Sequence, residues 1–173
     1  KVFRELHALG GHDPYSASKS AADLVSQMYY SAFFQELGIP VGVARAGNVI
    51  GGGDWSDKRL FPDLVRAWSS NAPASLRSPE ATRPWQHVLE PLHGYMVLAE
   101  KLHENPGMPG ALNFGPDPED CLSVAEVAQI ASQFWPGNPG WEIDNEDRFH
   151  ESTDLSIDNS RARELLGVAP VWK

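Results

Sequence analysis

The stretch from Asp13 to Lys19 reads DPYSASK and opens a long helical pattern. Asp13 predicts an N-cap, Pro14 suits the first turn, and apolar residues recur at helical spacing as far as Gly38, which ends the pattern. Residues 40–46 (PVGVARA) then form a short, mostly apolar run, typical of a buried strand in a parallel sheet. A long helix followed by such a strand predicts an α/β architecture.

Helical and extended patterns continue to alternate downstream of this strand. The glycine-rich stretch 47–55 (GNVIGGGDW) predicts an irregular loop. Beyond it the sequence predicts helices over 61–70, 91–103, 123–134 and 159–166, and short strands over 74–76, 85–88 and 111–115. Ser123 and Glu126 have the spacing of a capping box. The carboxyl half is rich in Pro, Gly and Asp between its helices, which indicates a loop-rich lobe.

Composition limits the class of protein. The 173 residues carry 14 Lys and Arg against 23 Asp and Glu, a formal net charge of −9 at pH 7. That balance disfavours a nucleic-acid surface, which needs clustered basic residues. The single cysteine excludes an internal disulfide, and no apolar run approaches the roughly 18 residues that a membrane span needs. No His, Cys, Asp and Glu grouping has metal-ligand spacing. We therefore expect a cytoplasmic globular protein without a nucleic-acid, membrane or metal partner.

Tyr15 and Lys19 form the first candidate catalytic pair. A spacing of four places both side chains on one helix face, one turn apart. A free phenol ionises at about pH 10 and is a poor base at neutral pH, but a nearby cation stabilises the phenolate. The pair therefore suits general-base chemistry. An ordinary amphipathic helix that happens to hold Tyr and Lys is the alternative interpretation of this spacing.

Three sequence strings in a fixed order carry a resemblance to a known family. They are residues 10–19 (GGHDPYSASK), 51–55 (GGGDW) and 82–91 (TRPWQHVLEP). From about Phe3 to its end, the chain resembles the extended short-chain dehydrogenase/reductase family, and within it the 4,6-dehydratases of nucleotide sugars. The resemblance implies part of a Rossmann-like doubly wound parallel sheet plus a smaller mixed α/β substrate-binding lobe.

The resemblance also implies that the sequence is the carboxyl-terminal half of such an enzyme. We assign residues 1–50 to the carboxyl-terminal part of the NAD-binding Rossmann domain. Residues 51–173 then form mainly the nucleotide-sugar-binding lobe, with some segments returning to the sheet. The family begins with a strand and a Gly-x-x-Gly-x-x-Gly turn that holds the cofactor pyrophosphate, and this sequence has no such turn. The upstream Ser or Thr and the Thr-Ser-Asp-Lys string of the family are also missing, and whether Lys1 is the lysine of that string stays open.

The resemblance implies roles for residues on several segments. Tyr15 becomes the catalytic base, Lys19 binds the nicotinamide ribose of NAD, and Ala46 and Asn48 are further cofactor contacts. The predicted substrate contacts are Asn48, Arg59, Leu60, Arg77, Arg83, Asn113 and His150. Guanidinium groups suit a diphosphate because each one can bind it through two parallel hydrogen bonds. Solvated surface arginines and ordinary turn asparagines are the alternative interpretations.

The implied activity is NAD-dependent dehydration of CDP-glucose to CDP-4-keto-6-deoxyglucose, a lyase reaction of deoxysugar, surface-polysaccharide and O-antigen biosynthesis. A nucleotide-sugar epimerase or decarboxylase of the same family is one alternative, and a non-catalytic nucleotide-sugar-binding module is another. Similar enzymes pair through the Tyr-Lys helix. Here that helix carries apolar residues over more than one face: Leu24, Met28, Tyr29, Phe33 and Phe34. We expect a homo-oligomer through this helix, or contact of its second face with the absent half.

Overall fold

The computed structural model describes residues 2–11, 13–108, 110–144 and 154–172. The helices are α1 (Pro14–Tyr29), α2 (Leu60–Ser69), α3 (Leu89–Glu104), α4 (Val124–Gln133) and α5 (Ser160–Leu166), with a π-helical turn η1 (Tyr30–Phe34) and a 3-10 turn η2 (Pro118–Asp120). The strands are β1 (Val2–Phe3), β2 (Val43–Ala46), β3 (Asn48–Ile50), β4 (Ala74–Leu76), β5 (Thr82–Arg83), β6 (Trp85–His87), β7 (Ala111–Phe114), β8 (Leu122–Ser123), β9 (Trp141–Ile143) and β10 (Ser156–Ile157).

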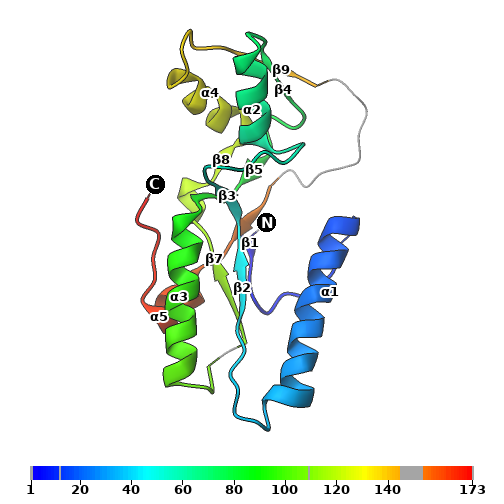
Figure 1. The fold of residues 1–173 in the computed structure, drawn as a ribbon, viewed down its shortest axis with the longest axis vertical. Coiled ribbons are helices and arrows are strands. Elements are labelled where there is room, and N and C mark those ends of the chain that lie inside the picture. Colours follow the sequence, from blue (N-terminus) through cyan, green and yellow to red (C-terminus); the bar gives the residue numbers. More distant parts are fainter. Residues whose placement is uncertain (1, 12, 109, 145–153, 173) are drawn as a thin grey trace.

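Parallel strand pairs run through the centre of the fold. β2 pairs with β7, β1 with β10, β3 with β6 and β4 with β9, all in parallel, whereas β5 and β8 pair antiparallel. In Figure 1, β2 and β7 lie between α1 and α3 in the lower part of the molecule. α2, α4 and β4 lie in the upper part. Parallel pairs need long crossover connections, and the segment from β3 to α3 supplies the one between β2 and β7. The structure therefore has the predicted α/β class with parallel strands.

Two hydrophobic clusters stabilise these two ends. The first joins α3, β7 and α5 through Leu98, Leu102, Leu112, Phe114, Ala162 and Leu166. The second joins α2, β4 and α4 through Leu64, Trp68, Ala74, Leu76 and Ala128. Ala44 of β2 packs against the first cluster, whose other members come from the range assigned mainly to the substrate lobe. The division of the chain at residue 50 stays a prediction.

The N-caps of α1 and α4 form as the sequence predicts. The Asp13 carboxylate accepts a hydrogen bond from the Ser16 N–H at 2.9 Å and caps α1. At α4 the Ser123 hydroxyl accepts from the Glu126 N–H, and the Glu126 carboxylate accepts from the Ser123 N–H. Both caps satisfy backbone donors that a helix start leaves without an intrahelical partner.

The structure differs from the sequence-based prediction at three places. α1 ends at Tyr29 rather than near Leu37, because the chain continues through the π-helical turn η1. The stretch 47–55, predicted to be irregular, contains β3, which is a strand because β6 pairs with it. The strands β1, β5, β8, β9 and β10 were not predicted, because strands of two or three residues carry almost no periodicity.

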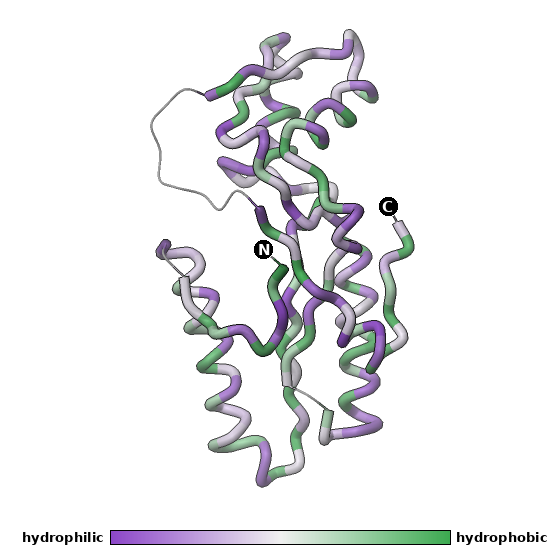
Figure 2. Tube along the Cα trace, turned by 180° about the vertical axis from the view of Figure 1, so that it is seen from behind, coloured by the Kyte–Doolittle hydropathy of each residue, from purple (hydrophilic) through white to green (hydrophobic). Residues whose placement is uncertain are grey.

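α1 packs against the other described elements only weakly. Asp23 is the single buried residue among those described in α1, and neither hydrophobic cluster includes a residue of this helix. Leu24, Val25, Met28 and Tyr29 are between 48% and 56% exposed. Figure 2 shows apolar positions along α1, which stands at the margin of the molecule. None of the described helices combines the length and apolar character needed to cross a membrane.

Candidate active site

Tyr15 and Lys19 lie in the first turns of α1. The Lys19 Nζ lies 5.6 Å from the centroid of the Tyr15 ring, because four residues advance slightly more than one helical turn. Both side chains are exposed, and no residue in the described ranges hydrogen-bonds the Tyr15 hydroxyl. The two side chains share one helix face, as their spacing predicts. Their catalytic role stays a prediction.

Strand pairing brings the strings around Asn48 and Arg83 together. In the β3–β6 pair Asn48 lies opposite Trp85, and the Asn48 N–H donates to the Pro84 carbonyl at 3.0 Å. Gly47 permits this close crossing, because a Cβ at that position would lie 2.6 Å from the Pro84 oxygen. Arg83 directly precedes Pro84 and is half-buried. Two predicted substrate contacts that are distant in sequence therefore lie on adjacent segments.

Arg77 contacts the loop that precedes α2 and that carries Arg59. The Arg77 guanidinium donates to the Lys58 carbonyl at 2.8 Å, directly beside Arg59. Arg59 is exposed at the start of α2, and Leu60 is the half-buried first residue of that helix. Arg77 therefore contacts the loop that carries Arg59.

Side chains of the loop itself and of α2 also order this loop. The Ser56 N–H donates to the Asp54 carboxylate at 2.9 Å. This hydrogen bond, with smaller contributions from Arg59 and Arg66, lowers the pKa of Asp54 from its ordinary value. Arg66 in turn donates a hydrogen bond to the Trp55 carbonyl. The loop that presents Arg59 is therefore held by polar contacts of its own and with α2.

Asn113 differs from the other predicted contacts because its side chain is buried and already paired. It is 3% exposed, and its Nδ2 donates to the carbonyls of Phe3 at 3.3 Å and Asp158 at 3.2 Å. Both amide hydrogens are thus engaged, and a substrate contact there would use the side-chain oxygen. Ala46, the predicted cofactor contact, is exposed at the end of β2. His150 lies outside the described residues.

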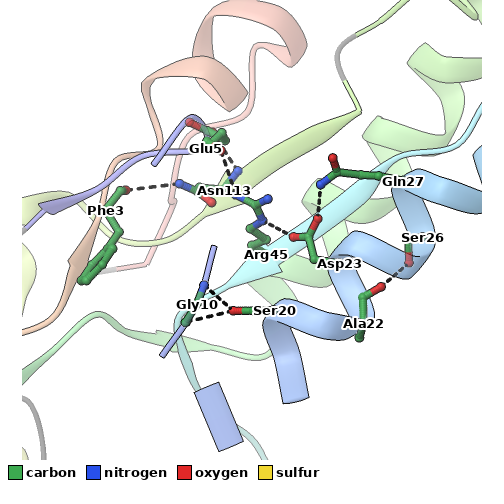
Figure 3. Close-up of polar contacts among 10 residues, drawn as sticks. All are labelled: Phe3, Glu5, Gly10, Ser20, Ala22, Asp23, Ser26, Gln27, Arg45 and Asn113. Carbon is green, nitrogen blue, oxygen red and sulfur yellow. Dashed lines mark hydrogen bonds and ion pairs between the residues drawn. The ribbon is translucent and has the colours of Figure 1, made fainter. Parts of the chain in front are cut away.

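An ion pair that was not predicted from the sequence joins α1 to β2. The Arg45 Nε donates to the Asp23 carboxylate at 2.6 Å, and the Asp23 side chain is 7% exposed (Figure 3). Burial raises the pKa of Asp23, but hydrogen bonds from Arg45 and Gln27 outweigh burial, so the pKa lies below its ordinary value. A signal was present in the sequence, because Arg45 interrupts an otherwise apolar strand. A charge in a strand predicted to be buried indicates a paired charge.

Tyr15, Lys19 and Ala46 are the residues of this site that could contact an organic cofactor. Within the described ranges, no group of three or more His, Cys, Asp or Glu side chains could hold a metal ion. The exposed Tyr15 and Lys19 can contact a sugar hydroxyl of a cofactor. Ala46 lies at the carboxyl end of the parallel strand β2, where α/β proteins bind ligands. These residues therefore fit one end of a dinucleotide.

The chain is similar in sequence to a curated protein. No family model matches the chain. The CDP-glucose 4,6-dehydratase of Salmonella typhimurium (strain LT2) is 41% identical over 176 residues, which cover 98% of this chain and 49% of that protein. The chain therefore spans about half the length of the curated relative that it matches.

Solved structures with a similar fold are nucleotide-sugar enzymes. UDP-glucuronic acid 4-epimerase from Bacillus cereus, solved with UDP-glucuronic acid and NAD, has a TM-score of 0.85 at 16% identity over 100% of this chain and 52% of its own. dTDP-glucose 4,6-dehydratase from Bacillus anthracis str. Ames, solved with NAD, has a TM-score of 0.78 at 20% identity, with the same coverage of 100% and 52%. At these identities the structures show the fold alone, and they confirm its predicted Rossmann-like α/β class. The sequence match confirms the resemblance of this chain to CDP-glucose 4,6-dehydratase over about half the length of that enzyme.

Proposed function

We propose that the chain is part of a nucleotide-sugar 4,6-dehydratase, a lyase that converts CDP-glucose to CDP-4-keto-6-deoxyglucose with NAD. The observation that carries the proposal is the placement of Lys19 beside Tyr15, 5.6 Å from its ring, at the exposed start of α1. The similarity to CDP-glucose 4,6-dehydratase, at 41% identity, narrows the substrate to CDP-glucose. In this proposal the remainder of the full-length protein supplies the glycine turn for the cofactor pyrophosphate.

Tyr15 and Lys19 perform the proton chemistry in the proposed mechanism. Lys19, Ala46 and Asn48 would hold NAD, which would supply hydride acceptance at sugar C4 and hydride return at C6 around the loss of water across C5 and C6. The Tyr15 phenolate removes the proton of the C4 hydroxyl. Lys19 stabilises that phenolate by its charge and binds the nicotinamide ribose. Ala46 and Asn48, at the end of β2 and the start of β3, complete the cofactor contacts of this chain.

The remaining predicted residues hold the nucleotide sugar. Arg59, Arg77 and Arg83 bind the diphosphate together with Asn48, Leu60 packs on the nucleotide, and Asn113 and His150 are further contacts. Two observations support this grouping: the β3–β6 pair sets Asn48 beside the segment of Arg83, and Arg77 contacts the loop of Arg59. Charge-assisted hydrogen bonds to a diphosphate are about twice as strong as neutral ones, so these arginines dominate substrate affinity.

The setting of the enzyme is also part of the proposal. It acts in the cytoplasm, where its nucleotide sugar and NAD are made, and its product enters deoxysugar, surface-polysaccharide and O-antigen biosynthesis. The protein forms a homo-oligomer through α1. The exposed apolar side chains of that helix, including Leu24 and Met28, support this interface.

The test is turnover of CDP-glucose by the full-length protein with NAD. Tyr15→Phe removes one oxygen from an exposed ring, so the fold and NAD binding should survive while kcat falls at least about a hundredfold, the contribution of a general base. Tyr29→Phe is the matched control, because it makes the same change on the same helix at 48% exposure. Its kcat should stay at the wild-type level. Near-full activity of Tyr15→Phe would make the Tyr15–Lys19 pair structural and the mechanism wrong.

Product analysis separates the alternatives. A product that has lost one water and gained a ketone supports the dehydratase. Isomerisation without loss of water would indicate an epimerase, and release of carbon dioxide from a uronic-acid substrate would indicate a decarboxylase. Binding of CDP-glucose without any conversion would indicate the non-catalytic binding module.

A further inference from the structure

A chain of polar contacts links α1 to the parallel strands (Figure 3). Arg45 of β2 donates from Nε to the Asp23 carboxylate at 2.6 Å and from Nη1 to the Glu5 carbonyl at 3.2 Å. The Glu5 carboxylate accepts the backbone N–H of Asn113 on β7 at 2.9 Å. Gln27, one turn after Asp23 on α1, donates to the other Asp23 oxygen at 2.6 Å. One carboxylate of α1 is thereby connected to β2, β7 and the segment after β1.

This carboxylate lies on the same helix as the proposed catalytic pair. Tyr15, Lys19 and Asp23 follow one another at intervals of four, so they form one slowly drifting row along α1. Eight residues from Asp23 to Tyr15 correspond to about 12 Å along the helix axis. The Asp23–Arg45 contact therefore holds α1 at a point two helical turns from Tyr15.

Few other contacts attach α1 to the rest of the described chain. Asp23 is the buried residue of α1, and the apolar side chains of the helix stay outside both hydrophobic clusters. The other polar tether is Ser20, whose hydroxyl accepts from the Gly10 N–H and donates to the Gly10 carbonyl, both at 2.9 Å. That tether binds the segment just before the helix and not a strand. Asp23 and Arg45 therefore supply the direct side-chain link from α1 to the parallel strands.

The strand end of this link carries further site residues. Arg45 directly precedes Ala46, and Asn48 follows after Gly47, so Arg45 lies on the same stretch as the proposed cofactor and substrate contacts. The ion pair thus joins the segment that carries the proton acceptor to the segment that carries the ligand contacts.

We infer that Asp23 and Arg45 are positioning residues, which fix the distance of Tyr15 and Lys19 from the ligands held at the ends of β2 and β3. This inference rests on the proposed dehydratase function. A positioning role differs from a stabilising role in its effect on kinetics. An error of about 1 Å in placing a catalytic group can lower the rate about a hundredfold without weakening substrate binding.

The experiment measures kcat and KM for CDP-glucose in the full-length protein with NAD. Asp23→Asn keeps the size of the side chain but removes the charge that Arg45 binds. Its kcat should fall by about ten- to a hundredfold while KM stays within about twofold, because the proposed substrate contacts lie outside α1. Asp23→Glu restores the charge and should recover most of kcat.

Asp117→Asn is the matched control. Asp117 forms an ion pair with Arg163 of α5 and is 19% exposed, so the variant also breaks a link between two segments. In Figure 1, α5 and α1 lie on opposite sides of β2 and β7. The kcat of this variant should stay within about twofold of wild type if only the α1 link matters. Equal losses in Asp117→Asn and Asp23→Asn, or an unchanged kcat in Asp23→Asn, would overturn the inference.

Hydrogen exchange of the full-length protein gives a readout that needs no turnover. Asp23→Asn should speed amide exchange in α1 by at least about tenfold and leave α3 unchanged, since a local tether is lost without global unfolding. Unchanged exchange in α1, or equal acceleration in α1 and α3, would also overturn the inference. If wild-type protein turns over no CDP-glucose, the proposed function fails separately. The affinity of Asp23→Asn for NAD then tests the positioning role. A displaced Lys19 should weaken NAD binding, and an unchanged affinity for NAD would refute the positioning role.

Discussion

α1 and α3 are both 16 residues long and lie on either side of the β2–β7 pair, yet they are held in opposite ways (Figure 1). α3 buries Pro91, Gly94, Leu98 and Leu102. It approaches β7 so closely that a Cβ on Gly94 would lie 2.4 Å from the Phe114 ring. α1 buries Asp23 alone among its described residues, and its link to the strands is an ion pair.

The difference separates a helix that stabilises the fold from one that presents a site. Apolar burial is strong in sum, so α3 is held by many contacts between its buried face and the core. An ion pair with a hydrogen bond fixes one direction and one distance, and removal of one partner is costly because it leaves the other charge unpaired. The helix that carries Tyr15 and Lys19 is thus the one whose placement depends on a specific contact.

The largest expected contrast is between two leucines. Leu98→Ala on α3 should destabilise the 173-residue chain by about 2 to 5 kcal/mol, because Leu98 is 4% exposed and its loss leaves a cavity. Leu24→Ala on α1, at 56% exposure, should change the free energy of unfolding by no more than about 0.5 kcal/mol. Urea unfolding measures both. Similar losses would mean that α1 is packed as α3 is. A larger Leu24→Ala effect in the full-length protein would show that another segment or a second copy of the protein covers α1.

A smaller effect tests the ion pair through its pH dependence. Asp23→Asn should cost about 1.5 to 3 kcal/mol at neutral pH, the range for a hydrogen bond to a charged group. The pKa of Asp23 is lowered in the folded chain, so its stabilisation is complete above the unfolded value of about 4 and is lost as pH falls through the folded value. Unfolding curves of wild type and Asp23→Asn should therefore differ by a constant amount from pH 7 to about pH 5 and converge in more acidic buffer. A difference that grew on acidification would contradict this assignment.

The smallest effects compare the two caps. Ser123→Ala should lower the free energy of unfolding by about 1 kcal/mol, because α4 belongs to the cluster of Trp68 and Ala128 and unfolds with it. Asp13→Ala removes an equivalent cap from α1, but α1 is in neither cluster. We expect it to speed amide exchange in the first turn of α1 while global unfolding changes less. Equal global losses for the two caps would show that α1 folds as one unit with the rest.

Those features of the candidate site that depend on a single continuous segment could be predicted from the sequence. Tyr15 and Lys19 share a helix face because helical geometry alone fixes residues four apart. The capping box of Ser123 and Glu126 follows from the same kind of short-range spacing. In contrast, the burial of Asn113 and the engagement of its amide hydrogens by Phe3 and Asp158 come from segments far away in sequence. No local pattern contains that information.

The sequence by itself determined the helices, their starts and the α/β class, since these depend on dihedral preferences and apolar periodicity within a few residues. Only the tertiary structure decided that Asn48 lies opposite Trp85, that part of a glycine-rich loop becomes β3, and that Asp23 binds Arg45. Each of these depends on two segments meeting, and the free energy of such a contact appears only once both are in place. An isolated Asp23 on a helix is one more surface charge, and it becomes a link between helix and sheet when β2 brings Arg45 to within 2.6 Å.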